Sequence, residues 1–285
     1  MRRKTASLLS ARREAGFTLV ELIVVIAITS IIAAVVAVFI RAPVEGYFDA
    51  ARRAELSDTA DTALRRMARD LRLALPNSVR TNGSAVEFLQ TRTGGRYRTE
   101  PASAGAPKCG SLGEDVLDFT ATDDCFEVLG SLIPAAVAGD MVVVYNLGIQ
   151  EATAYDNDNT ATVDAASDAS HIVLTAATLF PFESPGSRFH VVSGPVSYVC
   201  AGAGTVNGTG TGTLRRYSGY AMTSAQNAPP VGGSNALLAD KVSACAFVYQ
   251  QGVTERSGLV SMQLQITEDN ETVSLYHEVH VPNVP

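Results

Sequence analysis

Tryptophan is absent from the 285 residues, and cysteine occurs only four times. None of the cysteines stands in a C-x-x-C arrangement, which argues against zinc binding and against thioredoxin-like redox chemistry. Basic clusters are few beyond the N-terminal segment, and the formal net charge is −7. These features argue against nucleic acid as a partner. Ala, Thr, Ser, Val and Gly are plentiful instead, which predicts strands and loops in much of the chain.

Recognisable catalytic motifs are also missing from the sequence. It contains no G-x-S-x-G, no H-E-x-x-H, no P-loop and no G-x-G-x-x-G after a strand. His277 and His280 are three residues apart on an expected strand, so they should face opposite sides and make poor joint metal ligands. His190 is expected to be a strand residue rather than a general base. We therefore expect a protein that is not an enzyme.

One long hydrophobic run covers residues 17–40 and carries a single charge, Glu21. As a helix, a run of this length crosses the hydrocarbon core of a bilayer. The leader before it, residues 1–16, is rich in arginine and lysine. This positive charge predicts that the leader stays cytoplasmic and that the chain beyond the run lies outside the inner membrane. A lone carboxylate is costly in hydrocarbon, so Glu21 is expected to have a partner.

The junction between leader and run differs from an ordinary secretory signal. Such a signal is cut after its apolar stretch, next to small residues. Here the stretch is followed by RAPVEGYFD, which is not an A-x-A site, and the best boundary is Gly16–Phe17, before the stretch. A cut there would leave the helix attached to the mature chain and would create a new cationic N-terminus at the membrane face.

The stretch GFTLVELIVVIAI, residues 16–28, resembles the class III signal of type IV pilins and type II secretion pseudopilins. In that family, prepilin peptidase cuts after the glycine and methylates the new N-terminal residue. The resemblance implies cleavage between Gly16 and Phe17 and N-methylation of Phe17. It also implies a subunit-docking role for Glu21, which would pair with the N-terminal ammonium of a neighbouring subunit.

The helical pattern continues beyond the apolar run. Apolar residues recur at spacings of four and three along residues 60–74, which predicts an amphipathic helix. Pro43 and Gly46 weaken helices, so we expect a kink or a short break there. Pro76 disfavours helix at the residue before it, so the helix should end at Leu75.

From residue 76 onward the pattern is one of short strands. Eight β-branched or alternating segments are bounded by Gly, Pro, Asn or Ser: 84–92, 140–148, 170–177, 187–200, 212–222, 244–251, 259–268 and 272–281. They predict an antiparallel β-rich, pilin-like head with more than one sheet. The expected fold class is α+β, made of a leader (1–16), a transmembrane or filament-core helix (17–40), an amphipathic helix (41–75) and the periplasmic head (76–285).

All four cysteines lie beyond the membrane run, which suits disulfides in an oxidising compartment. Sequence order favours the pairs Cys109–Cys125 and Cys200–Cys245, although the sequence alone allows three pairings.

The best candidate for ligand binding is the stretch YDNDNTATVDAASD, residues 155–168. Asp156, Asp158 and Thr160 alternate as in calcium loops, and Asp164 and Asp168 follow. The stretch lacks the glycine and the terminal glutamate of an EF-hand. A solvated acidic loop is therefore favoured over a Ca²⁺ site, and no cofactor is expected.

Further segments resemble minor pilin-like subunits of the mannose-sensitive haemagglutinin (MSHA) pilus: 41–80, 188–200, 212–222, 237–249, 256–267 and 277–285. Residues 99–170 carry no such likeness. The resemblance implies a single-pass inner-membrane protein with a periplasmic head, which later reaches the pilus and the cell surface. Its implied partners are prepilin peptidase, other major and minor pilins and the inner-membrane assembly machinery. Adhesion by the head is compatible with this function.

Two alternatives stay open at this point. A J-type minor pseudopilin of a type II secretion system would have the same leader and a large head, and gene neighbours would separate the two. A membrane-anchored periplasmic enzyme or binding protein would use the helix only as an anchor and would need no cut after Gly16.

Overall fold

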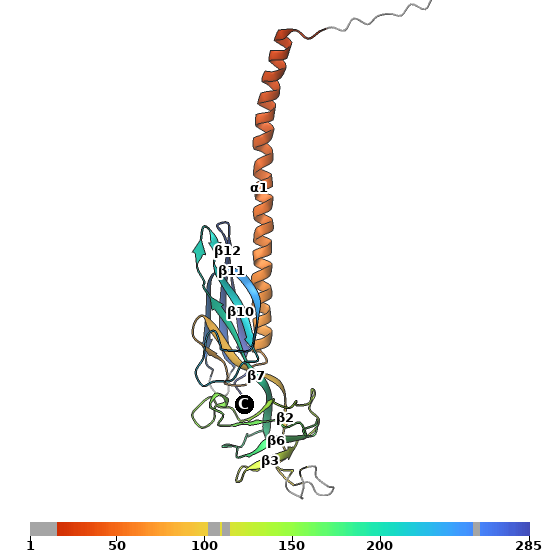
Figure 1. Cartoon of the computed structure of the whole chain (residues 1–285), viewed down its shortest axis with the longest axis vertical. Coiled ribbons are helices and arrows are strands. Elements are labelled where there is room, and N and C mark those ends of the chain that lie inside the picture. The colour runs from red at the N-terminus through yellow and green to blue at the C-terminus, as the bar shows by residue number, and fades with distance from the viewer. Residues whose placement is uncertain (1–15, 102–108, 110–114, 253–256) are drawn as a thin grey trace, which may run out of the picture. The chain divides into compact units, whose positions relative to one another are not determined.

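The computed structural model describes residues 16–101, 109, 115–252 and 257–285. The chain divides into two compact units, Met1–Arg52 and Arg53–Pro285, and each is described by itself. Nearly all of the expected leader lies outside the described residues. A long helix, α1, precedes an antiparallel β-rich part (Figure 1). The α+β class is therefore confirmed.

Helix α1 spans Leu19–Leu71 and is 53 residues long. It runs without interruption across Pro43 and Gly46, so the expected break does not occur. Proline removes only one backbone donor. A helix of this length keeps its other hydrogen bonds on both sides of Pro43.

The helix ends at Leu71, earlier than the expected Leu75. The backbone after Leu71 turns toward a strand, because Leu75 N–H donates to Leu89 O at 2.8 Å and Thr91 N–H donates to Leu73 O at 2.8 Å. Pairing with a strand thus ends the helix before Pro76 does.

The main sheet has nine strands, and seven of them follow the order β1-β2-β7-β10-β11-β12-β13, with β4 pairing with β5 and β7. Its strands are β1 (Arg80–Thr81), β2 (Ala85–Arg96), β4 (Met141–Val144), β5 (Thr160–Thr162), β7 (Arg188–Ala201), β10 (Gly212–Ser218), β11 (Ser234–Gln250), β12 (Gly258–Glu268) and β13 (Glu271–Val281). Two small sheets pair β3 (Asp123–Glu127) with β6 (His171–Thr178) and β8 (Thr205–Val206) with β9 (Thr209–Gly210), and a short 3-10 helix covers Ala154–Asp156.

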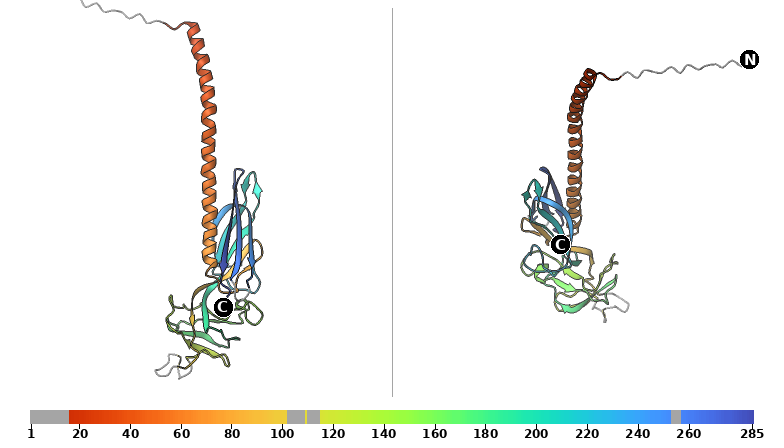
Figure 2. Two further views of the ribbon diagram at one scale, coloured as in Figure 1. Left: turned by 180° about the vertical axis from the view of Figure 1, so that it is seen from behind. Right: turned by 45° about the horizontal axis from the view of Figure 1, so that its top comes forward.

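The second half of α1 packs on one face of the main sheet. Its apolar stripe, which includes Leu64, Met67 and Leu71, is buried against Phe88, Tyr198 and other sheet residues. Both views in Figure 2 show the C-terminal strands beside this part of the helix. The spacing of four and three in the sequence thus produces the larger core of the head.

Polar contacts add to this packing along the second half of α1. Asp70 Oδ2 accepts hydrogen bonds from Tyr198 Oη at 2.7 Å and from Arg216 Nε at 2.8 Å. Arg53 forms an ion pair with Glu271 at 2.6 Å. The helix is therefore linked to β7, β10 and β13.

A second apolar core lies within residues 97–191. Tyr97, Phe126, Ile172 and Phe189 are buried in it. Strand β7 contributes to both cores, and its pairing with β2 has register shifts between Leu89 and Thr93. Bulges of this kind bend a strand pair, which fits a strand that serves two cores.

Two disulfides join Cys109 to Cys125 and Cys200 to Cys245. The second connects β7 to β11, and β10 lies between these strands in the sheet. The pairs are those that sequence order favours.

Candidate functional site

The expected cleavage site lies in non-helical chain directly before α1. Gly16, Phe17 and Thr18 precede the first helical residue, Leu19. Gly16 is exposed, and a Cβ built on it would meet no atom within 4 Å. Phe17 has 77% of its surface exposed. The Gly16–Phe17 peptide bond is therefore accessible, and it does not have to be freed from helical hydrogen bonds before cleavage.

Thr18 caps the N-terminus of α1. Its Oγ1 accepts a hydrogen bond from Glu21 N–H at 3.2 Å, and its carbonyl accepts one from Leu22 N–H at 3.1 Å. Thr-x-x-Glu is also the sequence of a capping box. This role of Thr18 is not among the predictions made from the sequence, although the pattern T-L-V-E signals it.

Glu21 lies in the first turn of α1. A carboxylate is stabilised there by the positive end of the helix dipole, by about 0.3–1 kcal/mol at an exposed position. The partly positive backbone of the first turn thus offsets part of the cost of placing this carboxylate near hydrocarbon. The new N-terminus at Phe17 would lie about one helical turn before it.

The surface of α1 that follows is apolar on all sides. Its most hydrophobic window has a mean hydropathy of 3.1, and none of that window is buried. The hydroxyls of Thr29 and Ser30 donate to the carbonyls of Val25 and Ile26, each at 2.7 Å, so these polar groups are satisfied within the helix. In the described part of the chain, α1 is the one helix long and apolar enough to cross a membrane, and it indicates membrane anchoring.

Residues 11–37 match the prokaryotic N-terminal methylation motif. The match includes Gly16, Phe17 and Glu21, and it indicates a type IV pilin-like or pseudopilin-like substrate of prepilin peptidase. No curated protein and no solved structure matches the chain.

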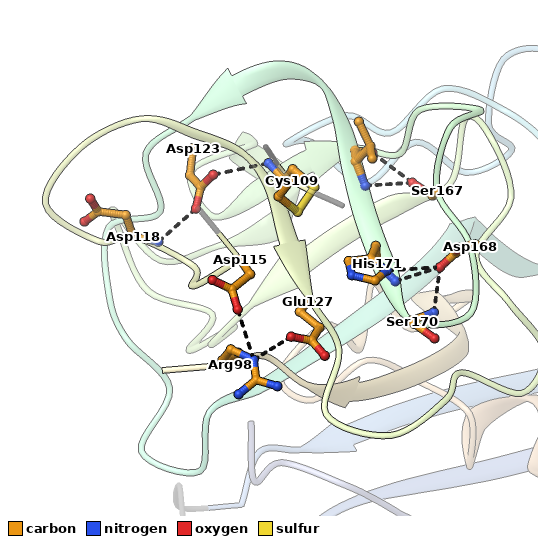
Figure 3. Close-up of a disulfide and its surroundings, with 12 residues drawn as sticks. Arg98, Cys109, Asp115, Asp118, Asp123, Glu127, Ser167, Asp168, Ser170 and His171 are labelled. Carbon is orange, nitrogen blue, oxygen red and sulfur yellow. Dashed lines mark hydrogen bonds and ion pairs between the residues drawn. A yellow bond between two sulfur atoms is a disulfide. The ribbon is translucent and has the colours of Figure 1, made fainter. Parts of the chain in front are cut away.

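The expected calcium ligands act as caps of turns. Asp164 Oδ1 accepts from Ala166 N–H at 2.9 Å, and Asp168 Oδ1 accepts from the N–H groups of Ser170 at 2.8 Å and His171 at 2.9 Å (Figure 3). Asp156 ends the short 3-10 helix, and Asp158 Oδ2 accepts from Thr153 N–H at 3.4 Å. In the parts of the chain that the structure describes, no three His, Cys, Asp or Glu residues are grouped so as to hold a metal ion.

The Cys109–Cys125 disulfide lies in this same region. Figure 3 shows it near Arg98, whose Nε contacts Asp115 Oδ2 at 3.3 Å and Glu127 Oε2 at 2.5 Å. Asp115 is buried with 1% of its side chain exposed, so the arginine compensates a carboxylate that would be costly alone.

His190, His277 and His280 have different environments in the structure. His277 and His280 are both on β13, where His277 is partly buried on the side of Val279 and His280 is exposed. His190 is in β7, and burial, followed by the charge of Arg188, lowers its pKa from 6.5 to about 4. A histidine that is neutral and held in a strand suits packing better than proton transfer near neutral pH.

A buried polar network lies under the loop that precedes β11, and it was not predicted from the sequence. Glu87 has 2% of its side chain exposed and pairs with Arg80 at 2.5 Å. Ser197 Oγ donates to Glu87 Oε2 at 3.1 Å, and Arg80 Nη2 donates to Thr223 O at 2.8 Å. The arginine neutralises the carboxylate and also holds the loop, so Glu87 is not a free base. The contacts form between residues far apart in sequence, which is why no local pattern predicts them.

Proposed function

We propose that the protein is a minor type IV pilin-like subunit of the MshO type, which acts in an initiation or tip complex of an MSHA-type pilus. The observation that carries this proposal is the accessible Gly16–Phe17 bond directly before an exposed apolar helix, within a methylation motif. The MSHA assignment is supported by the head segments that resemble this subfamily. The large head of this protein also distinguishes it from most major pilins, which supports a minor subunit.

The mechanism is assembly rather than catalysis. The subunit waits in the inner membrane with its head in the periplasm. Prepilin peptidase then cuts after Gly16 and methylates Phe17, and the new ammonium keeps its positive charge after methylation. The helix next leaves the bilayer and packs among the helices of other pilins, where Glu21 of one subunit pairs with the ammonium of another.

The experiment is mass spectrometry of the N-terminus after co-expression with prepilin peptidase. We expect a chain that begins with N-methylated Phe17, and a Gly16→Leu variant that stays uncut. Because a side chain at Gly16 meets no neighbouring atom within 4 Å at its Cβ, loss of cleavage in this variant reports on the peptidase rather than on folding. An unprocessed, unmethylated wild-type chain would contradict the proposal and favour a simple membrane anchor.

The assignment to the MSHA pilus needs a second readout. We expect the processed chain in MSHA pilus fractions of cells that make this pilus. Recovery with a type II secretion pseudopilus instead would favour the J-type pseudopilin.

A further inference from the structure

A basic groove lies in the head between the second half of α1 and the last strand, β13. It has a volume of about 540 Å³. Arg65 and Arg69 line it from the helix, Arg72 lines it from the turn directly after the helix, and His277 lines it from the strand. Asp61 is the acidic residue of the lining, and it pairs with Arg65 at 2.6 Å.

The two remaining arginines of the groove have no acidic partner among the described residues. Arg69 and Arg72 are exposed, and neither forms an ion pair with any residue that the structure describes. Arg69 lies in the last helical turn, where a cation is favoured by the helix dipole. The dipole explains a cation at this end of the helix, but not three guanidinium groups around one groove.

Strand β13 forms an open edge of the main sheet. It is the last strand in the sheet order, and its 11 residues pair with β12 in unbroken register. It contains no proline, no lysine and no bulge, which are the usual protections of an edge strand. The opposite edge strand, β1, has only 2 residues. A long edge with unpaired backbone groups is a template for an added strand.

We propose that this groove binds an extended acidic segment of another protein subunit, which adds a strand to β13 and pairs its carboxylates with Arg69 and Arg72. In an added strand, alternate side chains point to the same face of the sheet as His277. Carboxylates two residues apart in a strand point to the same face and are about 6.7 Å apart. An alternating acidic sequence therefore presents a row of carboxylates to the face of the sheet on which the groove lies.

A polypeptide fits better than a lipid, a nucleic acid or a free phosphate, because the edge of β13 offers hydrogen-bonding groups that match a peptide backbone. The arginines alone would accept any anion. This inference rests on the head alone and goes beyond the proposed role in pilus assembly. Its test leaves the N-terminal cleavage experiment unaffected, so the two can fail separately.

The test uses the full chain in uncharged detergent and a fluorescent decapeptide of alternating Glu and Thr. We expect this peptide to bind, with an affinity that falls as salt is raised. An Arg69→Gln/Arg72→Gln variant should bind at least about tenfold more weakly, which corresponds to about 1.4 kcal/mol. The matched control is Arg66→Gln, because Arg66 is exposed on α1 but does not line the groove, and it should bind like the wild type.

Two further probes separate strand addition from simple charge attraction. A Glu-Thr peptide with alternate backbone amides methylated should lose binding, and the amides of β13 should exchange more slowly with the unmodified peptide bound. Equal binding of the methylated peptide, or equal binding by the double variant, would overturn the proposal. So would binding of heparin or phosphatidylglycerol vesicles at the groove without binding of the peptide. Circular dichroism checks that the variants fold, and Arg72→Gln alone replaces the double variant if that one does not.

Discussion

At the scale of single residues, the proposed function gives Glu21 two interactions with one carboxylate. Its position in the first turn of α1 favours a negative charge. Its position one turn after Phe17 suits the ammonium that cleavage would create. The first interaction exists in the isolated chain, whereas the second needs a neighbouring subunit. Under the proposed function, Glu21 stabilises the start of α1 before assembly and selects the neighbouring subunit during it.

Replacing Glu21 separates these two roles. We expect Glu21→Ala to be cleaved nearly as well as the wild type, because the scissile bond and Thr18 are unchanged. Its entry into pili should fall by about tenfold or more, since the loss of about 1.4 kcal/mol of pairing changes an equilibrium constant tenfold. Immunoblots of sheared pili and of whole cells measure both effects.

The control for this experiment is Glu45→Ala. Glu45 is an exposed carboxylate of the same helix that pairs with Arg41 at 2.7 Å, and such pairs contribute little to stability. Normal incorporation of Glu21→Ala, or an equal defect in Glu45→Ala, would argue against the docking role.

His190 makes the stability of the head depend on pH. Its pKa is about 4 in the folded chain against 6.5 ordinarily, because burial disfavours its charged form. The unfolded chain therefore binds a proton at higher pH than the folded chain. The contribution of neutral His190 is complete above about pH 6.5 and is lost as the pH falls toward 4.

A His190→Gln variant tests this contribution. Between pH 7 and pH 4.5 we expect the wild type to lose about 2 kcal/mol more stability than the variant, from the linkage between pKa and folding. Urea unfolding of both proteins at the two pH values measures the difference, and comparison with the variant removes the shared titration of carboxyl groups. Parallel losses in the two proteins would show that His190 does not titrate as stated.

At the scale of elements, the two disulfides constrain different parts of the head. Cys200 and Cys245 are 45 residues apart in sequence and connect β7 to β11, and Cys200 is buried in the larger core. Cys109 and Cys125 are 16 residues apart. A longer closed loop restricts the unfolded chain more, which gives about 4 kcal/mol for the first bond and about 3 kcal/mol for the second.

Removing each pair of cysteines by alanine tests this order. We expect the Cys200→Ala/Cys245→Ala variant to be the less stable of the two double variants, by about 1 kcal/mol from loop length. Urea unfolding of the oxidised proteins gives the comparison, and the reduced wild type, which lacks both bonds, should be less stable than either variant. A larger loss from Cys109→Ala/Cys125→Ala would contradict the argument.

Elements with strong local periodicity were predictable from the sequence. The apolar stripe of α1 and the alternation along β12 and β13 are local patterns, and the structure has a helix and strands there. The early end of α1 was not predictable, because the backbone of Leu73 and Leu75 bonds to β2. β3 and β5 were missed because strands of 5 and 3 residues show too little alternation, and β11 begins ten residues before the segment expected for it.

At the scale of the whole molecule, the processing site can be predicted from local sequence. The buried network and the groove of the head cannot. Gly16, Phe17 and Glu21 form a contiguous motif that the chain carries however its head folds. The network of Arg80 and Glu87 and the groove lined by Arg69 and Arg72 depend on which strands and helices meet. Residues 117–174 contribute much of the second core, and no local pattern predicts how they meet.

The contacts that link α1 to the sheet also have a mechanical consequence. A pulling force on the helix would pass through Asp70 to Tyr198 on β7 and Arg216 on β10. The Cys200–Cys245 disulfide then transmits part of this force from β7 to β11. In such a pull, the non-covalent contacts between the helix and the sheet take the tension first, and the disulfide keeps the strands behind them from sliding apart.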